Sequence, residues 1–149
     1  MTPQCARITT LAAVLTLVSA CASVPMGSAE QDAEMKRSSA APDMSRVYIY
    51  RNENMGAAVK MAVAIDGRMI GATAANTYLA ADVTPGPHTI SSDAENLTLL
   101  KINAVPGRSI YVWQEVKIGF GYARSQLHLV PEAEGRAGVN ETKLAASVQ

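Results

Sequence analysis

The sequence predicts an all-β fold, a small β-sandwich of the immunoglobulin or prealbumin type with about seven or eight antiparallel strands. From Arg46 onward, short runs of β-branched and aromatic residues alternate with Gly, Pro and Asn, a pattern typical of strands and turns. The dipeptide Asp66-Gly67 separates two alternating runs, as a two-residue hairpin turn does. Turn signals recur about every eight to twelve residues, the usual spacing in a sandwich. We therefore expect one β-sandwich domain at 46–132.

The first predicted strand is RVYIYR, residues 46–51. Val47 and Ile49 would point to one side of the sheet, and Tyr48 and Tyr50 to the other. Because both faces are apolar, this strand is expected to lie in the middle of its sheet.

The next two strands flank Asp66-Gly67 in the segment VAIDGRMIG. A primed two-residue turn accepts positive φ and matches the twist of the strands. Pairing about this turn places Ile65 opposite Arg68 and Val63 opposite Ile70.

Two Pro-Gly pairs mark further turns. After Pro85-Gly86, Pro87 lacks the amide that a central ladder needs, so we expect the following strand to start at or after His88. The runs LTLLKINAV and SIYVWQEV flank Pro106-Gly107. Their pairing would set Leu100 against Trp113 and Ile102 against Tyr111, or one residue away, because a Pro-Gly pair favours a type II turn.

The last predicted strand is YARSQLHLV, with Leu127 and Leu129 inward and His128 outward. The tail at 133–149 is expected to form a short helix or a loose end, because Gly135 and Gly138 interrupt its helical pattern.

The first twenty residues predict a lipoprotein signal peptide, at 1–20. A positively charged start precedes an apolar run that is too short to span a bilayer, which takes about 20 apolar residues. Val18-Ser19-Ala20-Cys21 resembles the bacterial lipobox, which implies cleavage between Ala20 and Cys21 and acylation of the Cys21 sulfur. The alternative is an ordinary secreted protein, because Ala20-Cys21-Ala22 also fits the A-x-A pattern of general signal peptidase.

Cleavage would remove Cys5 and leave Cys21 as the single cysteine, blocked by acyl chains. The segment 21–45 is rich in Ala, Ser and charge and shows no apolar period, which predicts a lipidated cysteine followed by a disordered tether. The methionines at 26, 35 and 44 are spaced by nine residues and fit no helical face.

The charge balance excludes a nucleic-acid partner. Lys plus Arg and Asp plus Glu each number 13, so the chain has no overall field to attract a polyanion. The expected partners are the membrane, through acyl chains on Cys21, and an envelope protein or polysaccharide.

The sequence shows no catalytic residue set, metal site or cofactor motif. His88 and His128 are not paired at ligand spacing and are expected to be solvent-exposed. Ser125 lies three residues from His128, an offset that sends two strand side chains to opposite faces.

The segment GFGYAR, 119–124, is similar to a Gly-rich phosphate loop, but Arg124 replaces its third glycine and it joins two strands. Its glycines favour a turn, with Phe120 or Tyr122 folded over the edge of the core. Gly119, Phe120, Gly121 and Tyr122 form the candidate binding loop.

The order RVYIYR, VAIDGRMIG, DVTPGPHTI and VPGRSIYVW resembles the bacterial lipoprotein family called domain of unknown function 2846, over about 45–132. Residues 65–90 are also similar to PEGA-type modules, which are prealbumin-like sandwiches. These resemblances imply a fold and an envelope location, and they supply no catalytic residues.

Two functions are open at this point. The favoured one is a lipid-anchored binding or scaffolding module, and the alternative is a small envelope hydrolase that uses acids or a histidine. Ala22, instead of Asp, follows the predicted lipidated cysteine, so we expect the inner leaflet of the outer membrane, facing the periplasm.

Overall fold

Strand β1 (Ser45–Arg51) lies at the centre of a five-stranded sheet because both of its faces are apolar. Val47 and Ile49 are fully buried between the two sheets of the molecule. Tyr48 and Tyr50 are buried on the opposite face, under the helices. The predicted central strand is therefore confirmed.

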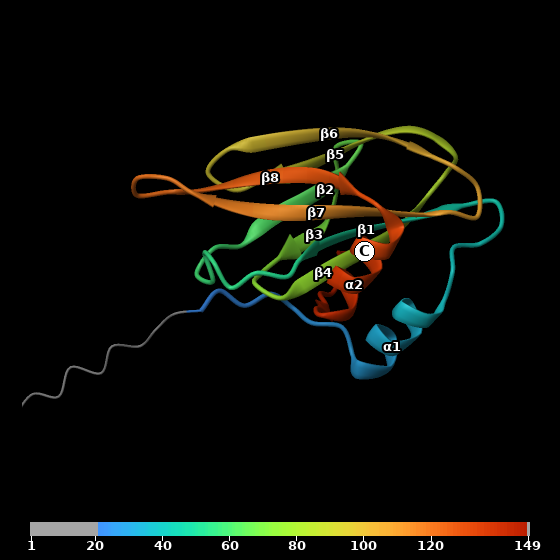
Figure 1. Ribbon diagram of the computed structural model, residues 1–149, viewed down its shortest axis with the longest axis horizontal. Coiled ribbons are helices and arrows are strands. Elements are labelled where there is room, and N and C mark those ends of the chain that lie inside the picture. The colour runs from blue at the N-terminus through green and yellow to red at the C-terminus, as the bar shows by residue number, and fades with distance from the viewer. Residues whose placement is uncertain (1–20, 149) are drawn as a thin grey trace, which may run out of the picture.

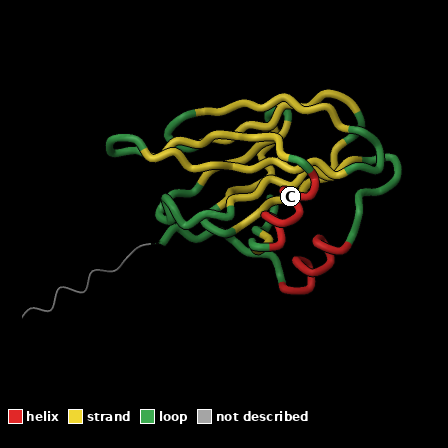
Figure 2. Tube along the Cα trace, in the orientation of Figure 1, coloured by secondary structure: helices red, strands yellow, loops and turns green. Residues whose placement is uncertain are grey.

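The computed structural model describes residues 21–148 and shows two sheets packed face to face, with two helices on the outer face of one of them (Figures 1 and 2). The five-stranded sheet has the order β8-β7-β1-β4-β9, and the four-stranded sheet has the order β3-β2-β5-β6. The all-β sandwich predicted from the sequence is confirmed. Besides β1, the elements are α1 (Ala29–Arg37), β2 (Met61–Ile65), β3 (Arg68–Thr73), β4 (Thr77–Val83), β5 (Gly86–Asp93), β6 (Leu97–Ala104), β7 (Ser109–Ile118), β8 (Ala123–Val130), α2 (Glu132–Asn140) and β9 (Lys143–Leu144).

The β2–β3 hairpin turns at Asp66 and Gly67, which have φ values of 52° and 78°. These angles fit the predicted primed turn, and Ile65 lies opposite Arg68 as expected. The predicted pairing of Val63 with Ile70 is wrong. A β-bulge between Val63 and Ala64 shifts the register, so Val63 lies opposite Gly71.

Strand β5 begins at Gly86, two residues earlier than predicted. Pro87 pairs with Asn103 of β6, whereas pairing with β2 begins only at Ile90. The strand therefore accommodates a proline where no second neighbour needs its amide.

The predicted pairing across Pro106-Gly107 is wrong. Strand β6 pairs with β5 in one sheet, and β7 pairs with β1 and β8 in the other, so Leu100 and Trp113 lie in different sheets. Two strand pairs, β1–β7 and β4–β9, are parallel, so the expectation of antiparallel strands throughout is also corrected. The Pro-Gly turn carries the chain between layers and closes no hairpin.

In β8, Leu127 is buried as expected, but Leu129 is exposed. Leu129 lies near the end of an edge strand, with no neighbouring strand on one flank. Its predicted inward position is therefore wrong.

The segment 21–45 is ordered, and the prediction of a disordered tether is wrong for it. Ser28 caps α1 through a capping box with Gln31, and acids begin the helix while bases end it. Lys36 donates to the Thr142 carbonyl over 2.7 Å, and the Asp32 carboxylate accepts the Leu144 amide over 3.0 Å. These contacts with the C-terminal segment fix α1 against the sandwich.

The C-terminal segment is also ordered. Helix α2 starts after Pro131, as expected, and runs through Gly135 and Gly138 without a break. A Cβ placed on Gly135 would lie 2.1 Å from Tyr111, and one on Gly138 would lie 2.1 Å from Tyr50. The two glycines let the helix backbone rest on tyrosines of the sheet, so they are docking positions and not interruptions.

Candidate functional site

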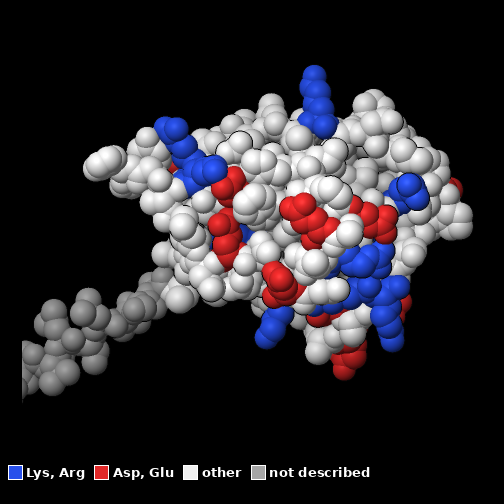
Figure 3. Space-filling view, in the orientation of Figure 1, with Lys and Arg blue, Asp and Glu red and all other residues white. Residues whose placement is uncertain are grey.

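The candidate binding loop forms the turn of the β7–β8 hairpin, which projects beyond the rest of the molecule (Figure 1). The Gly119 amide donates to the Tyr122 carbonyl over 2.9 Å, and Gly121 has a φ of 80°. The glycines make a tight turn, as predicted. Phe120 is fully exposed instead of folded over the core, so that part of the prediction is wrong. Figure 3 shows the end of this hairpin without charged side chains.

Arg51 is fully buried beneath the loop between β1 and β2, and sequence reasoning missed it. Its guanidinium donates to the carbonyls of Met55, Gly56 and Val59 over 2.6 to 2.9 Å. Burial lowers the pKa of Arg51. The side chain organises this loop from within.

A chain of buried polar side chains crosses the core. Ser125 and Gln114 each contact the Ser92 hydroxyl over 2.6 Å, and Thr73 donates to the Gln114 amide oxygen. His128 lies on the other face of β8, stacked on Trp113 and 2.7 Å from Glu115. Ser125 and His128 are therefore apart, as the strand offset predicts, and form no Ser-His pair.

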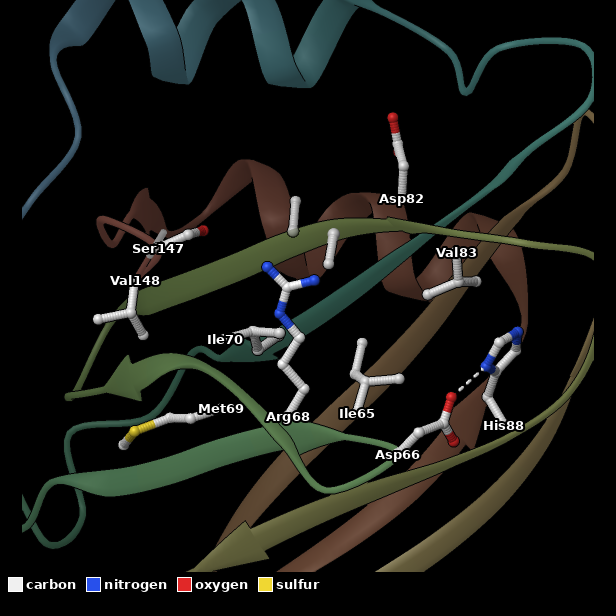
Figure 4. Close-up of a pocket in the computed structure, with 12 residues that line it drawn as sticks. Ile65, Asp66, Arg68, Met69, Ile70, Asp82, Val83, His88, Ser147 and Val148 are labelled. Carbon is white, nitrogen blue, oxygen red and sulfur yellow. Dashed lines mark hydrogen bonds and ion pairs between the residues drawn. The ribbon is translucent and has the colours of Figure 1, made fainter.

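A pocket of about 460 Å³ opens where β3 and β4, from different sheets, run near each other (Figure 4). Ile65, Ile70 and Val83 give it apolar walls, and Met69 and Val148 lie at its rim. The Val148 amide donates to the Ile70 carbonyl over 3.0 Å, so the C-terminal segment forms part of the wall. This pocket could not be predicted from the sequence, because strands from two different sheets build it.

His88 and Asp66 lie at one end of the pocket and form an ion pair (Figure 4). His88 Nδ1 is 2.6 Å from Asp66 Oδ2, and Nε2 is 2.7 Å from the Thr84 carbonyl. Asp66 also accepts the Thr89 amide over 2.8 Å. The His88 side chain is only 11% exposed, so the expectation that it is solvent-exposed is wrong.

Both ring nitrogens of His88 thus face acceptors, an arrangement that favours the imidazolium. The hydrogen bond to Asp66, helped by that to Thr84, raises the pKa of His88, and the same contact with His88 lowers the pKa of Asp66. When the His88 ring is protonated, both of its N–H groups are occupied and hold the β2–β3 turn on β5. It has no free nitrogen with which to take a proton from a substrate.

Arg68 supplies the available charge in the pocket. Its guanidinium points across the opening toward β4 (Figure 4) and makes no hydrogen bond or ion pair with any residue in 21–148. Asp82, on the facing strand, is already bound by Arg46 over 2.7 and 3.0 Å. A guanidinium beside apolar walls can hold a carboxylate or phosphate group of a ligand that also has an apolar part.

The histidine geometry leads to a pH prediction. The pKa of His88, followed through its ring protons by NMR, should lie above the ordinary value of 6.5 and should fall toward it in Asp66→Asn. Asn tolerates the positive φ of this position, so the turn should survive the substitution. The raised pKa of His88 means that the pair stabilises the fold fully between about pH 4 and pH 6.5 and loses this effect as the pH rises through the folded-state pKa of His88. The depressed pKa of Asp66 means that acid also removes it, below about pH 4.

A wild-type His88 pKa below 6.5 would contradict this assignment. It would mean that one nitrogen is free to act as a base, as the hydrolase alternative requires.

Within residues 21–148, no group of three or more His, Cys, Asp or Glu side chains is placed to hold a metal ion. The same part of the chain contains no helix that is long and apolar enough to cross a membrane. Cys21 is exposed and not in a disulfide, whereas Ala20 and the predicted signal peptide lie outside the described residues.

Comparison with known proteins adds a family. Residues 41–124 match the family described as protein of unknown function (DUF2846). An uncharacterized protein of Haemophilus influenzae is 32% identical over 136 residues, which cover 90% of this chain and 81% of that protein. No solved structure matches the chain, and the similarity of residues 65–90 to PEGA-type modules stays a prediction. The match spans β1 to the start of β8, and the chain belongs to the DUF2846 family.

Proposed function

We propose that the protein is a lipoprotein anchored in the cell envelope by acyl chains on Cys21, and that it acts as a binding or scaffolding module. The lipobox-like segment that ends at Cys21 supports the anchor. The exposure of Cys21 is compatible with it, because a modified sulfur must be outside the folded domain. Ala22 in the position after the cysteine favours the inner leaflet of the outer membrane, facing the periplasm.

The ordered N-terminal segment supports a position of the domain close to the proposed anchor. The Ala22 amide donates to the Ala57 carbonyl over 2.9 Å, one residue after the cysteine. Met26 then forms a β-bridge with Ala145, next to β9. The sandwich would therefore work at the membrane surface, because no flexible spacer separates it from the lipid.

The binding role rests on Arg68, an uncompensated cation at the mouth of an apolar pocket. A ligand that supplies an anionic group would gain a charge-assisted hydrogen bond there, and its apolar part would be covered by Ile65, Ile70 and Val83. Segments of envelope proteins and acidic envelope polysaccharides have such groups. His88 gives the hydrolase alternative no support, because both of its ring nitrogens are held by acceptors.

A photo-crosslinking amino acid at Met69 tests this role in intact cells. Met69 is 52% exposed at the pocket rim, so a bound partner should be captured there as a discrete crosslinked species. The same amino acid at Leu99 is the matched control. Leu99 is 62% exposed on β6, at the opposite edge of the same sheet. The Met69 product should decrease at least tenfold in Arg68→Glu, which reverses the charge that holds the ligand.

Protease or glycan-degrading enzymes then identify the captured partner as a protein or a polysaccharide. Equal capture from Leu99, or capture from Met69 that persists in Arg68→Glu, contradicts a binding role for the pocket.

A further inference from the structure

The end of the molecule that carries Cys21 also carries a group of exposed apolar side chains. Phe120 is fully exposed, Ile118 is 61% exposed, and Tyr122 shares their loop. Met55, also exposed, lies in the loop before β2, and the exposed Leu97 is the first residue of β6. Solvent-exposed apolar residues gathered at one end of a domain indicate a contact surface.

Contacts along the chain place this surface beside the anchor. Ala22 bonds to Ala57, and the neighbouring Gly56 packs on Val116, near the base of the β7–β8 hairpin. The Val116 amide also donates to the Glu53 carboxylate over 2.7 Å, from the same loop. The first residue after the cysteine and the hairpin are therefore bound to one loop.

Figure 1 shows the same arrangement along the longest axis of the molecule. The hairpin turn and the start of the described chain lie at one end, and the β6–β7 connection lies at the other. A flat surface at the anchored end could meet both the sulfur of Cys21 and the hairpin.

Charges at the hairpin suit a surface of phosphate groups. Lys117 and Arg124 lie opposite each other in the register, just behind the apolar turn. Lys117 is already paired with Glu115 over 2.5 Å, so Arg124 is the cation that remains for a phosphate group. Arg124 stacks over the Tyr122 ring at 4.8 Å and has no carboxylate partner among the described residues. Apolar residues in front and cations behind are the order that a lipid interface favours, with acyl chains deeper than head groups.

We infer that the hairpin tip, residues 118–122, inserts into the surface of the lipid bilayer that carries the acyl chains of Cys21. This inference rests on the proposed anchor and adds a second point of attachment to it. Two attachments restrict the rotation of the sandwich. With its long axis upright on the membrane, the end that holds the β6–β7 connection would point away from the lipid.

Fluorescence quenching by brominated lipids tests the insertion. The mature lipidated protein is reconstituted in vesicles of phosphatidylethanolamine and phosphatidylglycerol, with bromine placed either near the head group or near the end of the acyl chain. Phe120→Trp should be quenched at least twofold more by the shallow bromine than Val105→Trp. Val105 is exposed between β6 and β7, at the end of the domain away from the hairpin. Its variant therefore measures the background quenching of the native Trp113 and of a tryptophan that is not expected to reach the lipid.

A second comparison uses the unlipidated chain, Cys21→Ser, in vesicle co-sedimentation. Burial of a phenylalanine side chain corresponds to more than tenfold in affinity, so Phe120→Asp should lower vesicle binding at least tenfold. Its melting temperature should be unchanged, because the side chain contacts nothing in the fold.

Detergent phase partitioning of the same samples distinguishes a failure of the proposed lipid anchor from a failure of hairpin insertion. If the lipidated protein enters the detergent phase but Phe120→Trp is not quenched, the anchor stands and insertion is wrong. If no acyl chain is present, the anchor is wrong, and co-sedimentation of the unlipidated chain alone decides insertion. A dimer that Phe120→Asp dissociates, without quenching by bromine, would assign the hairpin tip to a second copy of the chain and overturn the inference.

Discussion

Cys21→Ser should abolish the permanent membrane anchor of the protein without changing its fold, and should leave only the weak, reversible membrane binding of the hairpin tip. The thiolate is the only group there that can form the thioether, and two or three acyl chains make release negligible on a cellular timescale, whereas one chain binds only reversibly. Palmitate label should disappear, and the protein should leave the detergent phase. The melting temperature should stay within about 2 °C of wild type, since an exposed substitution alters stability by about 0.5 kcal/mol at most.

Cys5→Ser is the matched control, because it removes the other cysteine and leaves the lipobox intact. It should keep full labelling. The Cys21→Ser chain should either retain its signal or, since Ala20-x-Ala22 persists, be cut by general signal peptidase and become soluble. Wild-type protein that takes up no label and stays in the aqueous phase would contradict the lipobox interpretation. Fractionation of the labelled wild type with inner-membrane markers would contradict the outer-membrane assignment.

Gly138→Ala should destabilise the protein by about 2 to 3 kcal/mol, although alanine is the better helix former by about 1 kcal/mol. The new methyl group would lie 2.1 Å from the Tyr50 ring, which is buried in the sheet and cannot move aside freely. Helix α2 would have to lift from the sheet. Thermal unfolding should show a melting temperature lowered by roughly 10 °C. Burial holds the pKa of Tyr50 at about 12, so undocking should also lower that value.

Ala137→Gly is the control for helix propensity at the neighbouring exposed position. It should cost only about 1 kcal/mol and leave the Tyr50 titration unchanged. A Gly138→Ala protein that is more stable than wild type would show that α2 does not rest on Tyr50.

The sequence was most informative where the deciding interactions are local. Asp66-Gly67 specifies its own turn, and the alternation of Val47 to Tyr50 identifies a strand covered on both faces. The glycine-made turn at 119–122 could likewise be placed from its residues, although the exposure of Phe120 could not.

Long-range packing decided the elements that sequence reasoning missed. The segment before Ser45 shows no apolar period, yet it is ordered by contacts with Thr142 and Leu144, which lie far along the chain. Gly135 has low helix propensity, but a helix pressed against Tyr111 requires a residue without a side chain. Arg68 is an ordinary hairpin residue in the sequence and becomes a binding candidate only because β4 lies across from it. Propensity and periodicity carry no information on any of these contacts.

The buried chain of Thr73, Gln114, Ser92 and Ser125 restricts how the two layers of the sandwich can be aligned. Gln114 and Ser125 belong to one sheet, and Thr73 and Ser92 belong to the other. Apolar side chains alone would tolerate a slide of one layer over the other, because dispersion and burial have little directional preference. Such a slide would separate hydroxyl and amide groups that have no water to replace their partners, at about 1 to 3 kcal/mol for each group. The sandwich therefore has one permitted alignment, and the positions of the pocket and of the hairpin relative to each other are fixed with it.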